Sequence, residues 1–242
     1  MPNTLVIANR ELKSFFTTWI GYIVIFAALL IDGLLFNAFA IGKESRLSAD
    51  VLYQFFYFSS GLGMVAGVFL AIRLIAEERS SGTIVLFLTS PVSERQFIYG
   101  KYLSAMVVFL ILQVFSLYLP LLVLLTGKIS FGHLLAGYLG TTLLGLSVLA
   151  ISLFASTMTA SQLVAGVVAA SMTVILLVLW LLAGVVDEPF RGIFSYLAIH
   201  NQHFRQFGLG IVQTKHLIYY LSVIIFFLEC SVKSMESRRL EG

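Results

Sequence analysis

The sequence predicts an all-α polytopic membrane protein with six transmembrane helices, an N-terminal interfacial amphipathic helix and a short cytoplasmic helix after the second span. Of the 242 residues, 59% are hydrophobic and only 11% are charged, which is more apolar surface than a soluble domain of this size can bury. Six apolar runs approach the length of about 20 residues that a spanning helix needs. Short segments of alternating hydrophobicity, which are typical of membrane β-barrels, do not occur in the sequence.

The apolar runs follow one another without a linker to a second domain, so residues 1–242 are expected to form one transmembrane domain. The last run is short, and it either spans with few residues or begins inside the polar segment before it. The runs lie at about 19–41, 55–76, 101–125, 133–156, 161–186 and 214–230.

Residues 1–18 precede the first span and carry an amphipathic pattern. Apolar side chains recur at helical spacing, and the polar side chains fall largely on the other side. This pattern suits a helix in the membrane interface with its apolar face toward lipid; the alternative is a simple extension of the first span. The apolar positions are Leu5, Ala8, Leu12, Phe15, Phe16 and Trp19, and the polar ones are Asn9, Arg10, Glu11, Lys13 and Thr17.

Six spans place both termini on the same side of the membrane. Nine Lys and Arg residues fall on that side and six on the other. Because cytoplasmic loops carry the excess of positive residues, we expect both termini and the loop after the second span to be cytoplasmic. The net charge of +3 is attributed to this topology, and no nucleic-acid partner is expected.

Segment 77–97 interrupts the apolar runs after the second span. Glu77 and Glu78 are too costly to lie in hydrocarbon, so they mark the exit from the membrane. Gly82 can end a helix or let another backbone approach closely, and residues 84–88 form a short apolar strip. The pattern favours a surface helix that contacts a soluble partner over an ordinary loop.

The chain re-enters the membrane through a capped helix. Pro91 interrupts any helix that precedes it. Ser93 occupies the N-cap position and Gln96 the capping-box position three residues later. We therefore expect a helix to begin directly after Ser93.

A known family shares these motifs. The run Glu-Glu-Arg-x-x-Gly-Thr-Ile-x-Leu-x-Leu-Thr-x-Pro-Val-Ser, which begins at Glu77, and the following Gly100-Lys101-Tyr102 resemble the cytoplasmic signature of type-2 ABC transporter permeases. The end of the chain, Leu-Ile-Tyr-Tyr-Leu-Ser-Val from Leu217 and then Ser-Arg-Arg, is similar to the last helix of small permeases in the gliding-motility and nitrous-oxide-reductase-maturation groups. The resemblance covers essentially the whole chain.

The resemblance implies a mechanism and a location. In such transporters two permeases, identical or related, form the transmembrane unit in the bacterial cytoplasmic (inner) membrane, and two cytoplasmic ABC ATPase subunits bind ATP and Mg beneath them. A coupling helix, here at about 80–89, sits in a cleft of the ATPase. The charged triplet before it either pairs with the ATPase or braces the N-terminal helix. The coupling residues carried over are Glu77, Glu78, Arg79, Ser80, Gly82, Thr83, Ile84, Leu86, Phe87 and Leu88.

The chain lacks the phosphate-binding loop of an ATPase, G-x-x-x-x-G-K-[ST]. The closest fragment is Gly127-Lys128-Ile129-Ser130, where the first glycine position is occupied by Leu122. We therefore expect a non-catalytic permease subunit without a cofactor of its own, which couples ATP hydrolysis by a separate subunit to export or to movement across the membrane.

Two further groups of residues are candidates for function. Asp32 lies near the middle of the first span, where a charge costs about 2.5–3.5 kcal/mol on insertion scales. It either lines a translocation path or hydrogen-bonds a neighbouring helix through Asn37 or Gln113. Gly63 and Gly67 form a small-xxx-small pattern that favours close helix packing, within the chain or between two copies.

Segment 187–213 is the longest connection on the extracytoplasmic side and is predicted to form short amphipathic helices or a re-entrant hairpin at that interface. His200 and His203 are three residues apart there, but two imidazoles without a nearby carboxylate or thiol make a poor metal site. No metal is therefore expected.

The sequence leaves two other functions open. In one, the permease transmits mechanical movement to an extracytoplasmic partner through 187–213. In the other, the Glu77-Glu78 pair belongs to an intramembrane protease; such enzymes carry an Arg four residues after the second Glu, where this chain has Gly82. The first alternative predicts a partner on the outer side, and both predict contact with membrane lipid.

Overall fold

The computed structural model describes residues 3–41, 48–88, 91–126 and 128–241. All regular elements in this part of the chain are helices, and six are long and apolar enough to cross a membrane. The predicted all-α architecture with six spans is therefore confirmed. The apolar segments are Gly21–Phe39, Ser48–Ser80, Glu94–Leu124, Phe131–Met158, Gln162–Ala183 and Thr214–Ser237.

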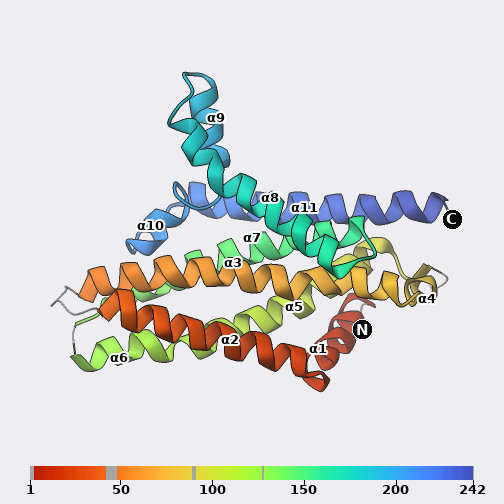
Figure 1. Ribbon diagram of the computed structural model, residues 1–242, viewed down its shortest axis with the longest axis horizontal. Helices are drawn as coiled ribbons and strands as arrows, with labels where there is room; N and C mark the ends of the chain where they lie inside the picture. Colours follow the sequence, from red (N-terminus) through yellow and green to blue (C-terminus); the bar gives the residue numbers. More distant parts are fainter. Residues whose placement is uncertain (1–2, 42–47, 89–90, 127, 242) are drawn as a thin grey trace.

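The long helices form a bundle with both chain termini at one end (Figure 1). We call this the terminal end, and the end that carries α6 and α10 the distal end. The elements are α1 (Asn3–Thr17), α2 (Trp19–Leu35), a π-helical turn η1 (Phe36–Ile41), α3 (Ser48–Ser80), α4 (Ile84–Leu88), α5 (Glu94–Ser116), α6 (Tyr118–Thr126), α7 (Phe131–Met158), α8 (Gln162–Ala183), α9 (Phe190–Leu197), α10 (Phe204–Gly208) and α11 (Thr214–Glu241).

Helix α1 is separate from the first span. The backbone of Thr18 is extended between α1 and α2, and α1 lies at a steep angle to α2 across the terminal end (Figure 1). A Cβ at Gly21 would lie 2.5 Å from the carbonyl oxygen of Phe15, so only glycine allows this tight turn. The geometry favours a distinct amphipathic helix over an extension of α2.

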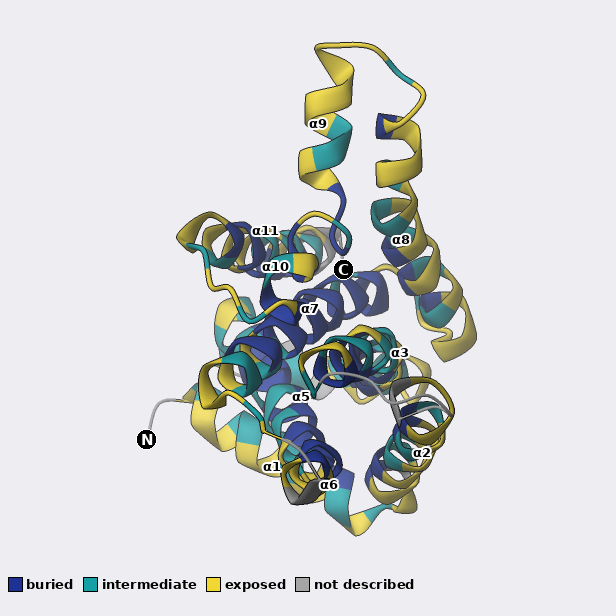
Figure 2. Cartoon of the chain, turned by 90° about the vertical axis from the view of Figure 1, so that its left-hand side faces the viewer, coloured by how far each residue is buried: buried dark blue, intermediate teal, exposed yellow. Residues whose placement is uncertain are grey.

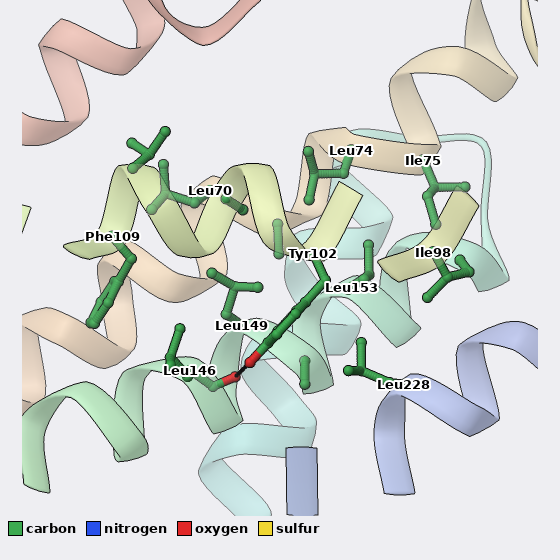
Figure 3. Packing of buried hydrophobic residues seen from close by; sticks show 14 of the residues in the cluster. Leu70, Leu74, Ile75, Ile98, Tyr102, Phe109, Leu146, Leu149, Leu153 and Leu228 are labelled. Carbon is green, nitrogen blue, oxygen red and sulfur yellow. Dashed lines mark hydrogen bonds between the residues drawn. The ribbon is translucent and has the colours of Figure 1, made fainter. Parts of the chain in front are cut away.

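Helix α7 is the centre of the bundle and is the most buried of the spans (Figure 2). Its glycines admit aromatic rings from other helices: a Cβ at Gly137 would collide with Phe56, and one at Gly145 with Phe109. The packing around it continues toward the terminal end, where Tyr102 donates a hydrogen bond to the carbonyl oxygen of Leu146 at 3.1 Å (Figure 3). Close packing of small residues against rings thus replaces the hydrophobic effect that is missing within lipid.

Several span boundaries differ from the sequence prediction. The second span begins at Ser48 and continues as helix through the charged triplet to Ser80. The last span is not short, because α11 runs from Thr214 to Glu241. A helix does not have to end where its apolar residues end. It can continue into water until it reaches a residue that breaks the helix. The third span is interrupted after Ser116, where Pro120 lacks the N–H that would bond that carbonyl.

Segment 187–213 contains the two short helices α9 and α10. Helix α9 projects away from the bundle beside the end of α8, and α10 packs against α7 and α3 at the distal end (Figures 1 and 2). The segment thus contains two short helices, and its position at the extracytoplasmic interface stays a prediction.

Candidate functional site

The candidate site is the turn between α3 and α5 at the terminal end. Helix α3 ends at Ser80, and Gly82 adopts a φ of 72°, a left-handed conformation that glycine tolerates best. The amide of Gly82 donates to the carbonyl of Arg79, and its own carbonyl accepts from the amide of Val85. These bonds fix α4 directly after the end of α3, so the predicted short helix exists.

The start of α5 has the predicted capping box. The Ser93 hydroxyl accepts from the amide of Gln96 at 3.3 Å, and the Gln96 side chain accepts from the amide of Ser93 at 3.3 Å. The same Gln96 oxygen accepts from the side chain of Asn3. The cap therefore also ties the start of α5 to the start of α1.

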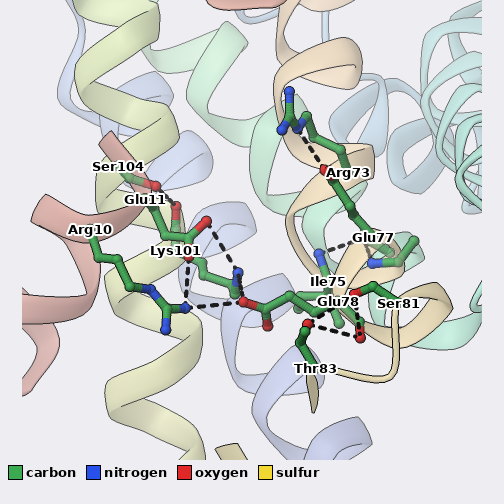
Figure 4. A network of polar contacts seen from close by, with 12 residues as sticks. Arg10, Glu11, Arg73, Ile75, Glu77, Glu78, Ser81, Thr83, Lys101 and Ser104 are labelled. Carbon is green, nitrogen blue, oxygen red and sulfur yellow. Dashed lines mark hydrogen bonds and ion pairs between the residues drawn. The ribbon is translucent and has the colours of Figure 1, made fainter. Parts of the chain in front are cut away.

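The inner side of the turn is held by a network of charges from three helices (Figure 4). Glu78 of α3 forms an ion pair with Lys101 of α5 at 3.0 Å and accepts a hydrogen bond from Arg10 of α1 at 3.1 Å. Glu11 of α1 pairs with the same two cations, at 3.3 Å to Lys101 and 2.9 Å to Arg10. Four side chains thus join α1, α3 and α5.

The centre of this network is buried. Only 1% of the Lys101 side chain is exposed, against 15% for Glu11 and 18% for Glu78. Helix α1 can approach so closely because Gly100 has no side chain; a Cβ there would lie 2.9 Å from Ile7. Burial alone would lower the pKa of Arg10, but the hydrogen bond to Glu11 and the charges of Glu11 and Glu78 raise the pKa above its ordinary value, so Arg10 stays charged.

For one residue of α1, the amphipathic pattern predicts the wrong face of the helix. The pattern places Glu11 with Arg10 on the outward polar face, but the Glu11 carboxylate turns inward to Lys101. A buried ammonium needs a counter-charge, and this requirement outweighs the preference of a carboxylate for water. The sequence feature that could have predicted this orientation of Glu11 is Lys101, next to Gly100 in the motif Gly100-Lys101-Tyr102.

The three residues of the charged triplet have different contacts. Glu78 braces α1 through Arg10, which is one of the two predicted alternatives. Glu77 pairs with Arg73 one turn earlier in α3 at 2.9 Å. Arg79 donates to the carbonyl oxygen of Thr157 at the end of α7 at 2.8 Å.

Helix α7 makes a second connection to this end of α3. The hydroxyl of Ser156 donates to the carbonyl of Ile72 at 2.7 Å and accepts from the amide of Ala76 at 2.9 Å. It therefore stands between a carbonyl and an amide that would bond each other in a regular helix. Ser156 therefore ties α3 to the end of α7 about one turn before α3 ends at Ser80.

The outer side of the turn is open. Residues 80–83 are exposed, and 57% of Val85 is exposed. Ile84 and Phe87 instead pack inward, and the Phe87 ring stacks on Phe97 with centroids 3.9 Å apart. Of the predicted coupling residues, the side chains of Leu86 and Leu88, and all of residue 89, lie outside the part of the chain that the structure describes.

Asp32 has a partner that the sequence did not predict. It is 6% exposed and accepts a hydrogen bond from Ser59 of α3 at 2.6 Å. Gln113 lines the same small cavity of about 10 Å³, but its side-chain oxygen accepts from Thr141. Asn37 is exposed on η1, so the structure brings together only two of the three predicted residues. The sequence feature that could have identified Ser59 is its position as a small polar residue within an apolar run.

Gly63 and Gly67 both face neighbours within the chain. A Cβ at Gly67 would lie 3.0 Å from the carbonyl oxygen of Gly145, and one at Gly63 would lie 3.4 Å from the ring of Phe109. Their backbones thus allow α3 to approach α7 and α5. The pattern allows helix packing within the chain or between two copies, and the structure shows packing within the chain.

The histidines hold segment 187–213 to the bundle. His203 donates from Nε2 to the carbonyl oxygen of Tyr196 at 2.8 Å, so its neutral Nδ1 accepts from Nδ1 of His216 at 2.8 Å. His200 contacts the Ser60 hydroxyl at 2.8 Å. Burial, aided by the neighbouring Lys215 and His216, lowers the pKa of His203 to about 4 although the bond to Tyr196 raises it. No group of three or more metal-binding side chains occurs among the described residues.

The family follows from comparison with known proteins. A family model described as ABC-2 family transporter protein matches residues 6–228, a range that includes α4, the charge network and the first half of α11. No curated protein is significantly similar to the chain. The chain therefore belongs to the ABC-2 transporter family and is a membrane-spanning permease component of an ABC transporter.

Proposed function

We propose that a separate ATPase subunit drives this permease by docking on α4 and on the exposed turn 80–83. The observation that supports this proposal most directly is the two-sided construction of the turn. Its outer side is exposed, including Val85, whereas its inner side is fixed by the ion pairs of Glu78 and by Arg79. A force on the outer side would therefore move three helices rather than bend a loop.

In this proposal the separate ATPase subunit binds and hydrolyses ATP. The sequence contains no G-x-x-x-x-G-K-[ST] loop, so ATP and Mg would bind to the ATPase. Two ATPase copies would act on two permeases, and the second permease would be another copy of this chain or a related one. The apolar, largely exposed sides of α2 and α8, which flank α3 in Figure 2, offer surfaces for that second permease and for lipid.

Helix α3 is the element that would carry the movement. Its 33 residues correspond to a rod of about 50 Å. Near the α4 end, the hydrogen bonds of Ser156 fix it to α7. Further along, Ser59 bonds Asp32 of α2. Motion of α4 would thus reach Asp32 and Gln113, which we propose as residues of the translocation path.

The bias of Lys and Arg supports an orientation with both termini and α4 in the cytoplasm. The charge network would then lie where a soluble ATPase can reach its outer side. Together with the family, this orientation supports placement in a bacterial cytoplasmic membrane and an export function.

The experiment uses the tagged full-length chain purified from its host membrane. We expect an ATPase subunit to co-purify and its ATP hydrolysis to respond to the permease. Val85→Asp should abolish both effects, because a charge would replace the exposed apolar side chain that α4 contributes to the docking surface. The matched control is Val185→Asp, the same change at another exposed valine, which lies between α8 and α9.

The two variants separate docking from folding. Both should keep the thermal stability of the parent, and Val185→Asp should retain the ATPase. If Val85→Asp retains the ATPase as well as the parent does, the docking surface is elsewhere. A purified complex that transports without any nucleotide-binding subunit would overturn the proposal as a whole.

A further inference from the structure

A buried carboxyl group lies in the middle of the bundle without a counter-charge. Asp32 of α2 is 6% exposed, and its hydrogen-bond donor is the neutral hydroxyl of Ser59, 2.6 Å away. No Lys, Arg or His side chain among the described residues forms an ion pair with Asp32. A carboxylate is costly in such a place unless a positive charge accompanies it. The site therefore needs one positive charge that the described part of the chain does not supply.

The space beside Asp32 has the size of one small particle. The cavity has a volume of about 10 Å³, close to the least that holds a water molecule. The helices α2, α3 and α5, which pack against one another, supply its lining. Its apolar wall includes Ala28, Leu29, Leu62 and Leu112. Because apolar surroundings strengthen electrostatic interactions, a charge inside the cavity would interact strongly with Asp32.

The polar part of the lining offers oxygen ligands. Ser59, Gln113 and Ser116 line the cavity together with Asp32. The hydroxyl of Ser59 donates to Asp32, and that of Ser116 donates to the backbone carbonyl of Gln113 at 2.8 Å. A hydroxyl oxygen has two lone pairs, so Ser116 keeps one even when Tyr138 donates to it at 3.1 Å. The side-chain oxygen of Gln113 also has two lone pairs, of which one accepts from α7.

Charge and size together select the occupant. A water molecule would fill the cavity but leave the carboxylate without a counter-charge, and a proton would neutralise the carboxylate but leave the cavity empty. A monovalent metal ion does both. A divalent ion would leave an excess of positive charge, and its usual sites supply several carboxylates or water molecules. Because Na⁺ is smaller than a water molecule and K⁺ is about as large as one, the narrow cavity favours Na⁺.

We propose that this cavity binds one dehydrated Na⁺ ion between α2, α3 and α5. Asp32 supplies the negative charge, and Ser59, Gln113 and Ser116 supply neutral oxygens. The proposal is independent of where the ATPase docks. Because the ligands come from three helices, a movement of α3 relative to α2 alters the site, and ion binding in turn biases that movement.

The test measures the binding of radioactive Na⁺ to the purified full-length chain in detergent, without ATP, in a buffer that contains a bulky organic cation at constant ionic strength. We expect saturable binding of one ion per chain. Because the ion binds only the folded chain, Na⁺ should also raise the melting temperature, by roughly 5–10 °C at a concentration about 100-fold above the Kd. At equal concentration K⁺ should give a smaller shift, and the organic cation should give none.

Two pairs of variants test the site itself. Asp32→Asn should lower the affinity for Na⁺ at least about tenfold, whereas Asp50→Asn, which removes the same charge from an exposed position of α3, should leave it unchanged. Gly63→Ala adds a methyl group to the lining at ordinary contact distance from Phe109, so the chain should fold but bind Na⁺ more weakly. Gly61→Ala, whose Cβ meets nothing within 4 Å, should bind as the parent does.

Several results would overturn the proposal. They are the absence of saturable binding, tighter binding of K⁺ than of Na⁺, equal melting temperatures in Na⁺ and in the organic cation, and an unchanged affinity in Asp32→Asn. A melting temperature that responds to pH through Asp32 but not to Na⁺ would show that the positive charge is a proton, and would also overturn it. Since the assay contains no ATPase, each of these results leaves the docking proposal standing.

Discussion

Replacing Lys101 with methionine tests whether the buried charge network holds the terminal end together. The ion pairs of Lys101 to Glu11 and Glu78 are 3.3 and 3.0 Å long, and each corresponds to roughly 5 kcal/mol of attraction at an effective dielectric constant of about 20. Desolvation of the charges and repulsion between the carboxylates offset most of this attraction. The net effect is therefore smaller than the sum of the pairs.

The variant leaves two partly buried carboxylates that share only Arg10. Removing one partner of a buried pair typically costs about 3–5 kcal/mol, and we expect the lower end because Arg10 remains. For a chain of this size that loss lowers the melting temperature by roughly 6–12 °C. The measurement is thermal unfolding in detergent, followed by the reaction of a thiol-specific fluorophore with the single, partly buried Cys230.

Two further variants make the measurement decisive. Lys13→Met is the same change at an exposed position of α1 and should leave the melting temperature unchanged. Lys101→Met combined with Glu78→Gln should recover part of the loss, with a coupling energy of about 0.5–3 kcal/mol. A Lys101→Met melting temperature within about 2 °C of the parent would refute the reasoning, because the network would then carry little stability.

Three other predictions follow from contacts at greater distance from the network. Gly67→Ala should destabilise the chain by about 1–3 kcal/mol, because its Cβ would lie 3.0 Å from a carbonyl of α7; Gly61→Ala, which meets nothing within 4 Å, is the control in the same unfolding assay. Asp32→Asn keeps an oxygen that accepts from Ser59, so we expect normal assembly but slower transport, and transport at the parent's rate would remove Asp32 from the path. Because burial lowers the pKa of His203 to about 4 from about 6.5 in the unfolded chain, the unfolded state binds more protons between these values. Stability should therefore fall as pH is lowered through that window and level off below it; His203→Gln should flatten this slope, and equal slopes would contradict the assignment.

Local patterns were sufficient to predict much of this architecture. Six spans follow from apolar length alone, because the cost of burying polar backbone in lipid leaves helices as the solution. The capping box at Ser93 was predictable because both of its hydrogen bonds join residues three apart. The span ends were less predictable, since α3 and α11 continue as helix beyond the apolar runs.

Contacts between distant segments were not predictable from these patterns. Amphipathicity assigns polar residues to water, yet Glu11 faces inward because Gly100 lets α1 approach the buried Lys101. The sequence suggests the longer side chains of Asn37 or Gln113 as the partner of Asp32, whereas the small Ser59 reaches it. Such pairs depend on which helix faces meet, and one sequence does not specify that.

The burial of α7 has a consequence for biogenesis. The helix is the fourth of the six spans in chain order, yet α11, the sixth, covers one of its sides, where the hydroxyl of Ser147 reaches the carbonyl of Tyr220. Until translation supplies α11, that side can only face lipid or another protein. Synthesis of α11 is thus also the step that closes the core, and chains truncated before Thr214 should be recognised by membrane quality control as unfinished.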